Sequence, residues 1–154
     1  MRHRQFFLLT LLAPFALVTG LRAAEPVWLT DLAEAKKFAA KEKKPILIYF
    51  TGSTWCGPCK LVHGEVLPTP AFAEFSKKHV LVMLDYPPFS ERSEEKVKAN
   101  PALAKRMEFK DRYKVSGFPT MIVLSPTGEE KARRTGYGKG LGPEAYLADL
   151  MTKN

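Results

Sequence analysis

The stretch Trp55-Cys56-Gly57-Pro58-Cys59 decides how the rest of the chain is interpreted, because it holds the only two cysteines among 154 residues. An apolar run, 45–50, precedes it, and a segment with a helical pattern, 60–67, follows it. Two thiols three residues apart on the first turn of a helix can form a disulfide, and the partial positive charge of a helix N-terminus favours a thiolate there. A strand, a tight turn, the cysteine pair and a helix therefore predict a redox site.

Two other uses of the cysteine pair stay open at this point. One is an inert structural disulfide, although a loop this short adds little chain-entropy stabilisation. The other is a zinc site, but such a site needs about four ligands, and only His63 and His79 are available to join the two cysteines. We therefore expect no metal, and no cofactor beyond a redox-active Cys56–Cys59 disulfide.

Residues 1–24 have the composition of a secretory signal peptide. Arg2 and Arg4 give a basic start, 6–18 is almost entirely apolar, and small residues follow. The apolar run is short for a membrane span, which needs about 20 residues. We expect a signal peptide at 1–24 and one domain at 25–154, located in the periplasm or secreted. An uncleaved anchor or a buried N-terminal helix is the alternative.

The chain is basic, with a formal net charge of +8. Without the three arginines at positions 2, 4 and 22, the 24 basic residues become 21 against 16 acidic ones, or +5. Five lysines gather on one amphipathic helix: Lys36, Lys37, Lys41, Lys43 and Lys44. A solvated helix face explains this cluster most simply, and weak attraction to an anionic membrane surface is the alternative. Export argues against a nucleic-acid partner.

The order of elements predicts an α/β fold. Asp31 has the features of a helix cap, with Glu34 three residues later, which places an extra helix near the N-terminus. We expect further helices or strands at 45–50 (strand), 60–67 (helix), from Thr69 (helix), 79–85 (strand), 100–114 (helix), 120–124 and 129–135 (a hairpin), and from Pro143 (helix). A surface excursion is expected at 86–100. This order implies a mixed central sheet with helices on both faces.

Two motifs make the chain resemble the thioredoxin-fold family, and in particular the exported thioredoxin-like proteins of bacterial envelopes. Residues 55–60, Trp-Cys-Gly-Pro-Cys-Lys, match the active-site motif of that family. Residues 117–120, Gly-Phe-Pro-Thr, match its cis-proline segment and stand at the expected place before the hairpin. The resemblance covers about 29–150 and implies a thioredoxin-like fold in which Pro119 is cis and lies against the cysteines. A trans proline in an ordinary turn is the alternative.

The resemblance implies a thiol–disulfide oxidoreductase, and the Gly-Pro pair between the cysteines favours one that reduces protein disulfides. Cys56 would then be the nucleophile and Cys59 the resolving cysteine. Gly57 would let the turn close, and Pro58 would stiffen it at a helix position that needs no N–H. An oxidase or isomerase is the alternative within the same enzyme class. A thioredoxin-fold binding module with incidental cysteines is the alternative outside it.

The resemblance also implies a substrate-binding surface and an electron donor. Trp55 and Phe118 would form the apolar rim of a shallow groove beside Pro119, and the backbone of Phe118 would pair with an extended substrate. The alternative is that the two rings only pack in the protein interior. A reductase in an oxidising compartment needs electrons, so we expect a membrane thiol-electron donor as a partner. We expect the protein itself to be a monomer.

The chain departs from cytosolic thioredoxins at the buried aspartate that serves the second cysteine. That position falls at Tyr49 or Phe50 here, and the next strand lacks the lysine that accompanies it. His63 lies four residues after Cys59, so a helix places both on one face. We consider His63 a candidate to supply or remove the proton of Cys59. A purely structural histidine is the simpler alternative, and Glu65 is a weaker candidate.

Overall fold

The computed structural model describes residues 25–152, so the expected signal peptide at 1–24 lies outside the described residues. The strands are β1 (Trp28–Leu29), β2 (Ile46–Thr51), β3 (Val80–Asp85), β4 (Thr120–Leu124) and β5 (Glu130–Thr135). The helices are α1 (Leu32–Glu42), α2 (Gly57–Glu65), α3 (Pro70–Ser76), α4 (Glu94–Ala99), α5 (Pro101–Arg112) and α6 (Pro143–Thr152), with a 3-10 turn η1 (Phe89–Glu91). No helix within 25–152 is both long enough and apolar enough to cross a bilayer.

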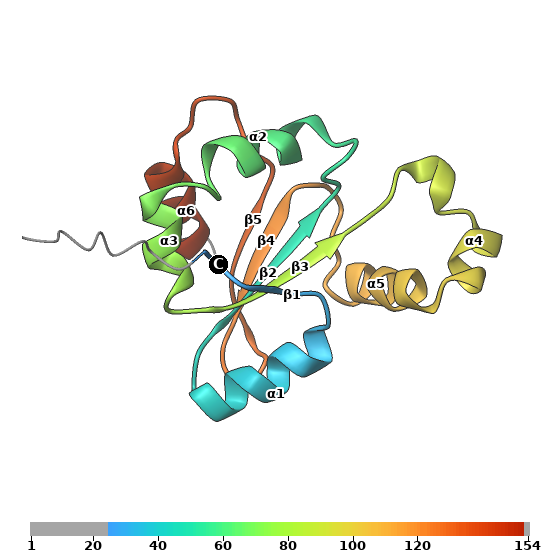
Figure 1. Ribbon diagram of the computed structural model, residues 1–154, viewed down its shortest axis with the longest axis horizontal. Coiled ribbons are helices and arrows are strands. Elements are labelled where there is room, and N and C mark those ends of the chain that lie inside the picture. Colours follow the sequence, from blue (N-terminus) through green and yellow to red (C-terminus); the bar gives the residue numbers. More distant parts are fainter. Residues whose placement is uncertain (1–24, 153–154) are drawn as a thin grey trace, which may run out of the picture.

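The five strands form one mixed sheet in the order β1-β3-β2-β4-β5 (Figure 1). β1 and β2 run parallel to β3, whereas β4 is antiparallel to both β2 and β5. β2 is central, and all six of its residues are buried. The register pairs Thr51 with Asp85 and Phe50 with Thr120, which brings the ends of β2 and β3 together with the start of β4. The expected mixed sheet is confirmed.

Alternation along the central strand separates two hydrophobic layers, because successive side chains of a strand point to opposite faces. Ile46, Ile48 and Phe50 pack against α1 and α5 on one face. Leu47 and Tyr49 pack against α2, α3 and α6 on the other. Figure 1 shows α1 and α5 on one side of the sheet and α2, α3 and α6 on the other. The expected arrangement of helices on both faces is confirmed.

The N-terminal helix begins where its sequence predicts. The carboxylate of Asp31 accepts hydrogen bonds from the backbone N–H groups of Ala33 at 2.6 Å and Glu34 at 3.2 Å. These bonds satisfy donors that have no partner inside the helix. Lys105 of α5 also donates to Asp31 at 2.7 Å, and this contact, with the two capping bonds, lowers the pKa of that carboxyl. The cap therefore also ties α1 to α5.

The sequence did not predict β1, because two residues are too few for an alternating pattern. Pairing of Trp28 with Leu81 in β3 turns the indole to the face of the sheet opposite α1. There it stacks on Phe72 of α3, with 5.8 Å between ring centroids, and lies 6.0 Å from Tyr49.

Both outer strands of the sheet have features that discourage pairing with another chain. β1 has only two residues. β5 is charged along most of its length, and Ala132 is its only buried residue. Arg133 of β5 donates to the backbone carbonyl of Tyr113 at 2.7 Å, which secures the strand to the segment after α5. Short or charged edge strands are a common protection against edge-to-edge association.

The two-layer core generates a prediction about stability. Ile48 is fully buried in the centre of the sheet, so Ile48→Ala should lower the free energy of unfolding by about 2–5 kcal/mol through lost burial and a residual cavity. Val27 is 79% exposed, and Val27→Ala should change that free energy by less than about 0.5 kcal/mol. Urea unfolding followed by circular dichroism measures both. Equal losses in the two variants would contradict the placement of β2.

Candidate active site

The two cysteines are joined in a disulfide across the first turn of α2. Their Cα atoms are 5.2 Å apart, and Cys56 is the residue that caps the helix. Its Sγ accepts a hydrogen bond from the backbone N–H of Cys59 at 3.3 Å. Cys59 is fully buried and Cys56 is 6% exposed. Cys56 is thus only slightly more exposed than Cys59, and its sulfur lies over the end of the helix.

The turn that presents the cysteines is fastened to the end of β3. The backbone N–H of Cys56 donates to the carbonyl of Gly52 at 2.8 Å, which closes the turn. The backbone N–H of Ser53 donates to the carboxylate of Asp85 at 2.8 Å, and the hydroxyl of Ser53 donates to the same carboxylate. Asp85 therefore holds the approach to α2 from the neighbouring strand, a role that the sequence did not reveal.

The cis-proline segment lies beside this turn. The Phe118–Pro119 peptide bond is cis, as the resemblance predicted. Pro119 is buried, and its carbonyl accepts a hydrogen bond from Gly136 at 2.7 Å. The ring of Phe118 meets the indole of Trp55 edge to face, with 5.8 Å between centroids and an interplanar angle of 89°. The structure thus brings together the predicted groove residues Trp55, Phe118 and Pro119.

The excursion after β3 adds to this surface in a way that was not predicted. The indole N–H of Trp55 donates to the carbonyl of Tyr86 at 2.7 Å. Phe89, which is 74% exposed, approaches Trp55 with 5.3 Å between ring centroids. The guanidinium of Arg92 lies 4.0 Å from the ring centroid of Phe89. An aromatic residue soon after two prolines was the only sequence signal for this contribution.

Tyr49, rather than Phe50, occupies the position that faces the cysteine helix. Phe50 points to the opposite layer, with α1 and α5. The hydroxyl of Tyr49 donates to the backbone carbonyl of Cys59 at 3.5 Å and accepts from the hydroxyl of Thr51 at 3.1 Å. Burial raises the pKa of Tyr49, so its hydroxyl stays protonated at neutral pH. A neutral donor therefore stands where cytosolic thioredoxins carry a carboxylate.

His63 shares α2 with Cys59, and its ring centroid lies 5.6 Å from that of Tyr49. Its Nε2 atom is buried and has no hydrogen-bond partner among the described residues. Burial lowers the pKa of His63, and the negative charge of Asp85 opposes this effect to a smaller extent. The imidazole is therefore neutral at pH 7 and able to accept a proton.

Glu65, the weaker candidate, is engaged elsewhere. Its carboxylate accepts a hydrogen bond from the hydroxyl of Tyr137 at 2.7 Å and another from the backbone N–H of Gly140 at 3.2 Å. These bonds tie the end of α2 to the glycine-rich segment before α6. Glu65 thus has a structural role, and His63 is the better placed of the two titratable groups.

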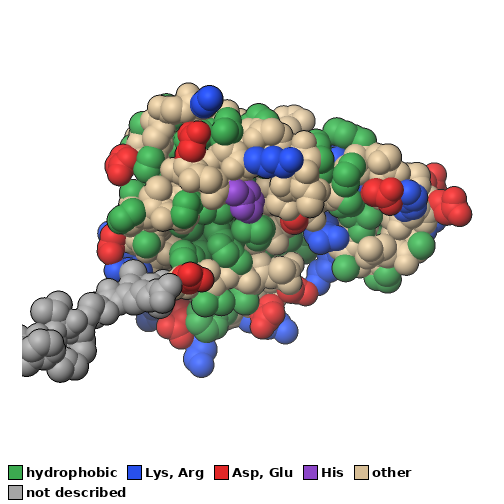
Figure 2. All heavy atoms as spheres, turned by 45° about the horizontal axis from the view of Figure 1, so that its top comes forward, with side chains coloured by type: hydrophobic (Ala, Val, Ile, Leu, Met, Phe, Trp, Pro, Cys, Tyr) green, Lys and Arg blue, Asp and Glu red, His purple; other side chains and the backbone are tan. Residues whose placement is uncertain are grey.

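A hollow of about 540 Å³ lies beside the end of α2 and the start of α3 and is lined in part by His63, Leu67 and Ala73. Figure 2 shows an apolar hollow on this face of the molecule with a histidine at its rim. Within residues 25–152, no group of three or more His, Cys, Asp or Glu side chains is placed to hold a metal ion. The ring of His63 borders this hollow, although its Nε2 atom is buried.

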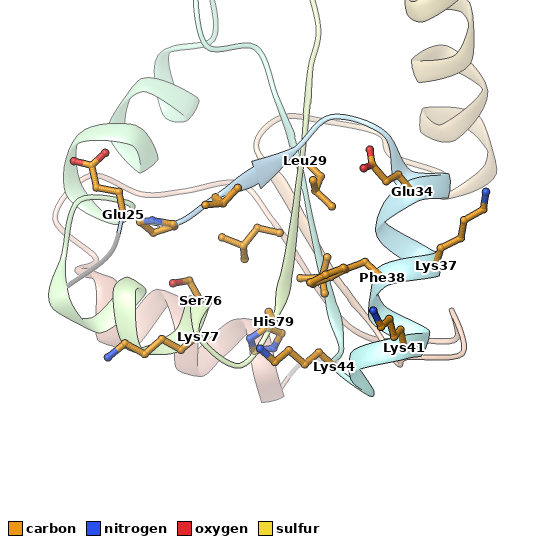
Figure 3. Close-up of a pocket in the computed structure, with 14 residues that line it drawn as sticks. Glu25, Leu29, Glu34, Lys37, Phe38, Lys41, Lys44, Ser76, Lys77 and His79 are labelled. Carbon is orange, nitrogen blue, oxygen red and sulfur yellow. The ribbon is translucent and has the colours of Figure 1, made fainter.

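A second hollow, about 690 Å³, lies away from the cysteines, between α1 and the start of β3. Figure 3 shows Phe38 and Leu29 at its apolar centre, with Lys37, Lys41 and Lys44 around it. None of its lining residues belongs to the cysteine turn or to the cis-proline segment. This hollow is therefore separate from the disulfide and from the surface beside it. Part of the predicted lysine cluster forms its margin.

Comparisons with known proteins agree with this geometry. The family described as a thioredoxin-like domain matches residues 32–150. The disulfide bond reductase DsbH of Chlamydia pneumoniae is 33% identical over 131 residues, which cover 84% of this chain and 74% of that protein. A solved structure of the DsbH oxidoreductase has a TM-score of 0.67 and 30% identity, and covers 95% of this chain and 92% of its own.

A second relative is longer than this chain. The thioredoxin-related protein DsbJ of Chlamydia pneumoniae is 34% identical over 142 residues. The match covers 88% of this chain but only 39% of DsbJ. The similarity therefore concerns one part of that protein.

The packing of the cysteine turn generates a prediction for two nearby glycines. A Cβ added at Gly52 would overlap the indole of Trp55, whereas one added at Gly64 would meet nothing within 4 Å. Gly52→Ala should displace the indole and lower the free energy of unfolding by about 1–3 kcal/mol. Gly64→Ala, inside α2, should raise it by about 0.5–1 kcal/mol.

Tryptophan fluorescence and urea unfolding separate the two variants. Gly52→Ala should change the emission of Trp55, which is held by Tyr86, while Gly64→Ala should leave it unchanged. An unaltered spectrum and stability for Gly52→Ala would show that the indole does not pack on this turn.

Proposed function

The chain belongs to the thioredoxin-like domain family and is a thiol–disulfide oxidoreductase, and from this premise we propose that it is an exported reductase of protein disulfides. The observation that carries the proposal is the Cys56–Cys59 disulfide at the start of α2, beside the segment that contains Pro119. The similarity to DsbH, which is named a disulfide bond reductase, supports the reducing direction. The signal-like composition of 1–24 supports export and a periplasmic location.

In the proposed cycle, the thiolate of Cys56 attacks one sulfur of a substrate disulfide. The substrate S–S bond breaks, its other sulfur leaves as a thiolate, and a mixed disulfide with Cys56 forms. Cys59 then loses its proton and attacks the sulfur of Cys56. The Cys56–Cys59 bond forms, and the second substrate sulfur is released as a thiolate. Two electrons pass to the substrate, and the structure corresponds to the oxidised enzyme at the end of this cycle.

The local structure suits Cys56 to the role of nucleophile. Cys56 caps α2, where the unpaired N–H groups and the helix dipole stabilise a thiolate. The N–H of Cys59 already points at its sulfur. Pro58 lies in the first helical turn, where its missing N–H removes no helical bond, and Gly57 beside it faces open space. Cys59, fully buried behind this turn, suits the resolving role.

Substrates would bind across Trp55, Phe118 and Pro119. Among the described residues, neither the N–H nor the carbonyl of Phe118 makes a backbone hydrogen bond. An extended substrate can therefore pair with this residue as an added strand. The edge-to-face contact of Phe118 with Trp55 supplies an apolar surface next to the sulfur of Cys56. In this proposal the protein would work as a monomer and would receive its electrons from a membrane thiol-electron donor.

The groups nearest to Cys59 that could exchange a proton with it, Tyr49 and His63, are both neutral at pH 7. Tyr49 binds the backbone of Cys59 and stays protonated, so it serves to fix the helix rather than to accept a proton. His63, four residues after Cys59, is neutral at pH 7 and has an unpaired Nε2. We propose that His63 accepts the proton of Cys59 and that its charge influences the pKa of the two thiols.

The cysteine roles and the reducing direction are tested together. Cys56→Ser should reduce insulin no faster than the buffer control, because the attacking thiolate is gone. The Cys56–Cys59 pair should equilibrate with glutathione or dithiothreitol at a potential nearer to thioredoxin, about −270 mV, than to the oxidant DsbA, about −120 mV.

Each alternative function has its own outcome in these experiments. A potential near that of DsbA would favour an oxidase or isomerase. Insulin reduction by the wild type that is no faster than that by Cys56→Ser and the buffer control would favour a binding module in which the cysteines are incidental. Cys59→Ser should retain the attack and accumulate a mixed disulfide with the substrate, which non-reducing electrophoresis detects.

The role of His63 predicts a pH dependence. Because its pKa is lowered, the ring gains a proton only below the ordinary value of 6.5, and the positive charge then favours a nearby thiolate. In the reduced protein, the rate of Cys56 alkylation should therefore stay appreciable below about pH 6.5, and His63→Gln should abolish this reactivity at acid pH. His79→Gln is the matched control, because His79 stacks on Phe75 at the other end of β3. An identical rate profile in wild type and His63→Gln would refute the assignment.

A further inference from the structure

Arg92 lies beside the proposed substrate surface although it comes from the excursion between β3 and α4. Its guanidinium carbon is 4.0 Å from the ring centroid of Phe89, 5.0 Å from that of Trp55 and 5.8 Å from that of Phe118. Three rings from three separate segments therefore surround one cation. Trp55 directly precedes Cys56, and Phe118 directly precedes Pro119, so the cation faces the residues that flank the disulfide.

This cation has no carboxylate partner within residues 25–152. The ion pairs of the excursion join Glu91 to Lys96 and Glu94 to Lys98, and neither includes Arg92. By contrast, Arg133 is paired with Glu130. The Nε and Nη2 atoms of Arg92 are also buried without a hydrogen-bond partner among the described residues.

Unpaired guanidinium donors of this kind call for an explanation, because buried polar groups in folded proteins nearly always have partners. Burial lowers the pKa of Arg92, which shows that its charge is incompletely compensated by its surroundings. The aromatic faces contribute cation–π attraction, but they accept none of its N–H groups in the plane of the guanidinium. A carboxylate is the group whose two oxygens match that planar fork.

We infer that Arg92 recognises a carboxylate on the substrate, close in sequence to the disulfide that Cys56 attacks. The inference rests on the proposed reductase function and specifies its substrates. The carboxylate would be an acidic side chain or the C-terminus of a short segment after the cysteine. The ring centroid of Phe89 lies 4.0 Å from the guanidinium carbon, and Phe89 is 74% exposed, so its ring would turn aside to let the carboxylate reach the buried Nε and Nη2 atoms.

The test compares short peptides that each contain one disulfide and differ at a single position beside a cysteine. Capped peptides carry Glu, Gln or Lys at that position, and a further Gln peptide ends there in a free carboxylate. The reduced protein is mixed with each peptide, and the rate constant is divided by that for dithiothreitol, which corrects for the intrinsic reactivity of each disulfide. The free-carboxylate peptide distinguishes a chain end from an acidic side chain.

The wild type should reduce the Glu peptide about fivefold faster than the Gln peptide, and the Lys peptide slowest. Added salt should diminish the preference, because it screens the attraction between the charge of the approaching peptide and the guanidinium. In Arg92→Gln the Glu-to-Gln ratio should fall to about 1, and Arg92→Lys should keep only part of it, since a lysine lacks the planar fork. Arg112→Gln is the matched control, because Arg112 also lies over an aromatic ring, that of Phe109, but outside this site.

The ratio is internal to each variant, so partial loss of folded protein does not affect it. Equal normalised rates for all peptides with the wild type would overturn the inference and leave the reductase function intact. So would an Arg92→Gln variant that slows every peptide equally, because Arg92 would then act on the thiols or on the fold. Failure of the wild type to reduce any peptide would instead overturn the reductase function itself.

Discussion

The catalytic turn of this protein depends on its attachment to the end of β3. Asp85 binds the backbone and hydroxyl of Ser53, and the carbonyl of Tyr86 binds the indole of Trp55. The backbone of Tyr86 in turn donates to Thr51 at 2.9 Å, which extends the pairing of the parallel strands past their last residues. The position of the cysteines is thus set by strand pairing as well as by their own helix.

Much of this arrangement could be predicted from local patterns. The cap at Asp31, the central strand, the cysteine turn and the hairpin each carry their own signal within a few residues, and the structure confirms them. The strand β1 could not be predicted, because two residues have no periodicity and its place depends on Leu81 far along the chain. The environment of Arg92 could not be predicted from the sequence either, because rings from three separate segments form it.

The substitution of a tyrosine for a buried carboxylate changes the electrostatics beneath the disulfide. A buried carboxylate is expensive to ionise without a partner, and β3 supplies no lysine. Tyr49 avoids that cost, because its neutral hydroxyl can bind Thr51 and the carbonyl of Cys59 at once. The sequence alone left Tyr49 and Phe50 as equal alternatives. Register decides between them, since a shift by one residue turns a side chain to the other face of a sheet.

The outer strands of the sheet have a consequence for the way other polypeptides can meet this protein. Extended segments of another chain readily join a free sheet edge and remain there. Here β1 is short and β5 is charged, and both features discourage such pairing. The unpaired backbone of Phe118 is by contrast a single residue, which can align an extended segment but offers few hydrogen bonds to retain it. These features favour brief contacts with other chains over lasting association along the sheet.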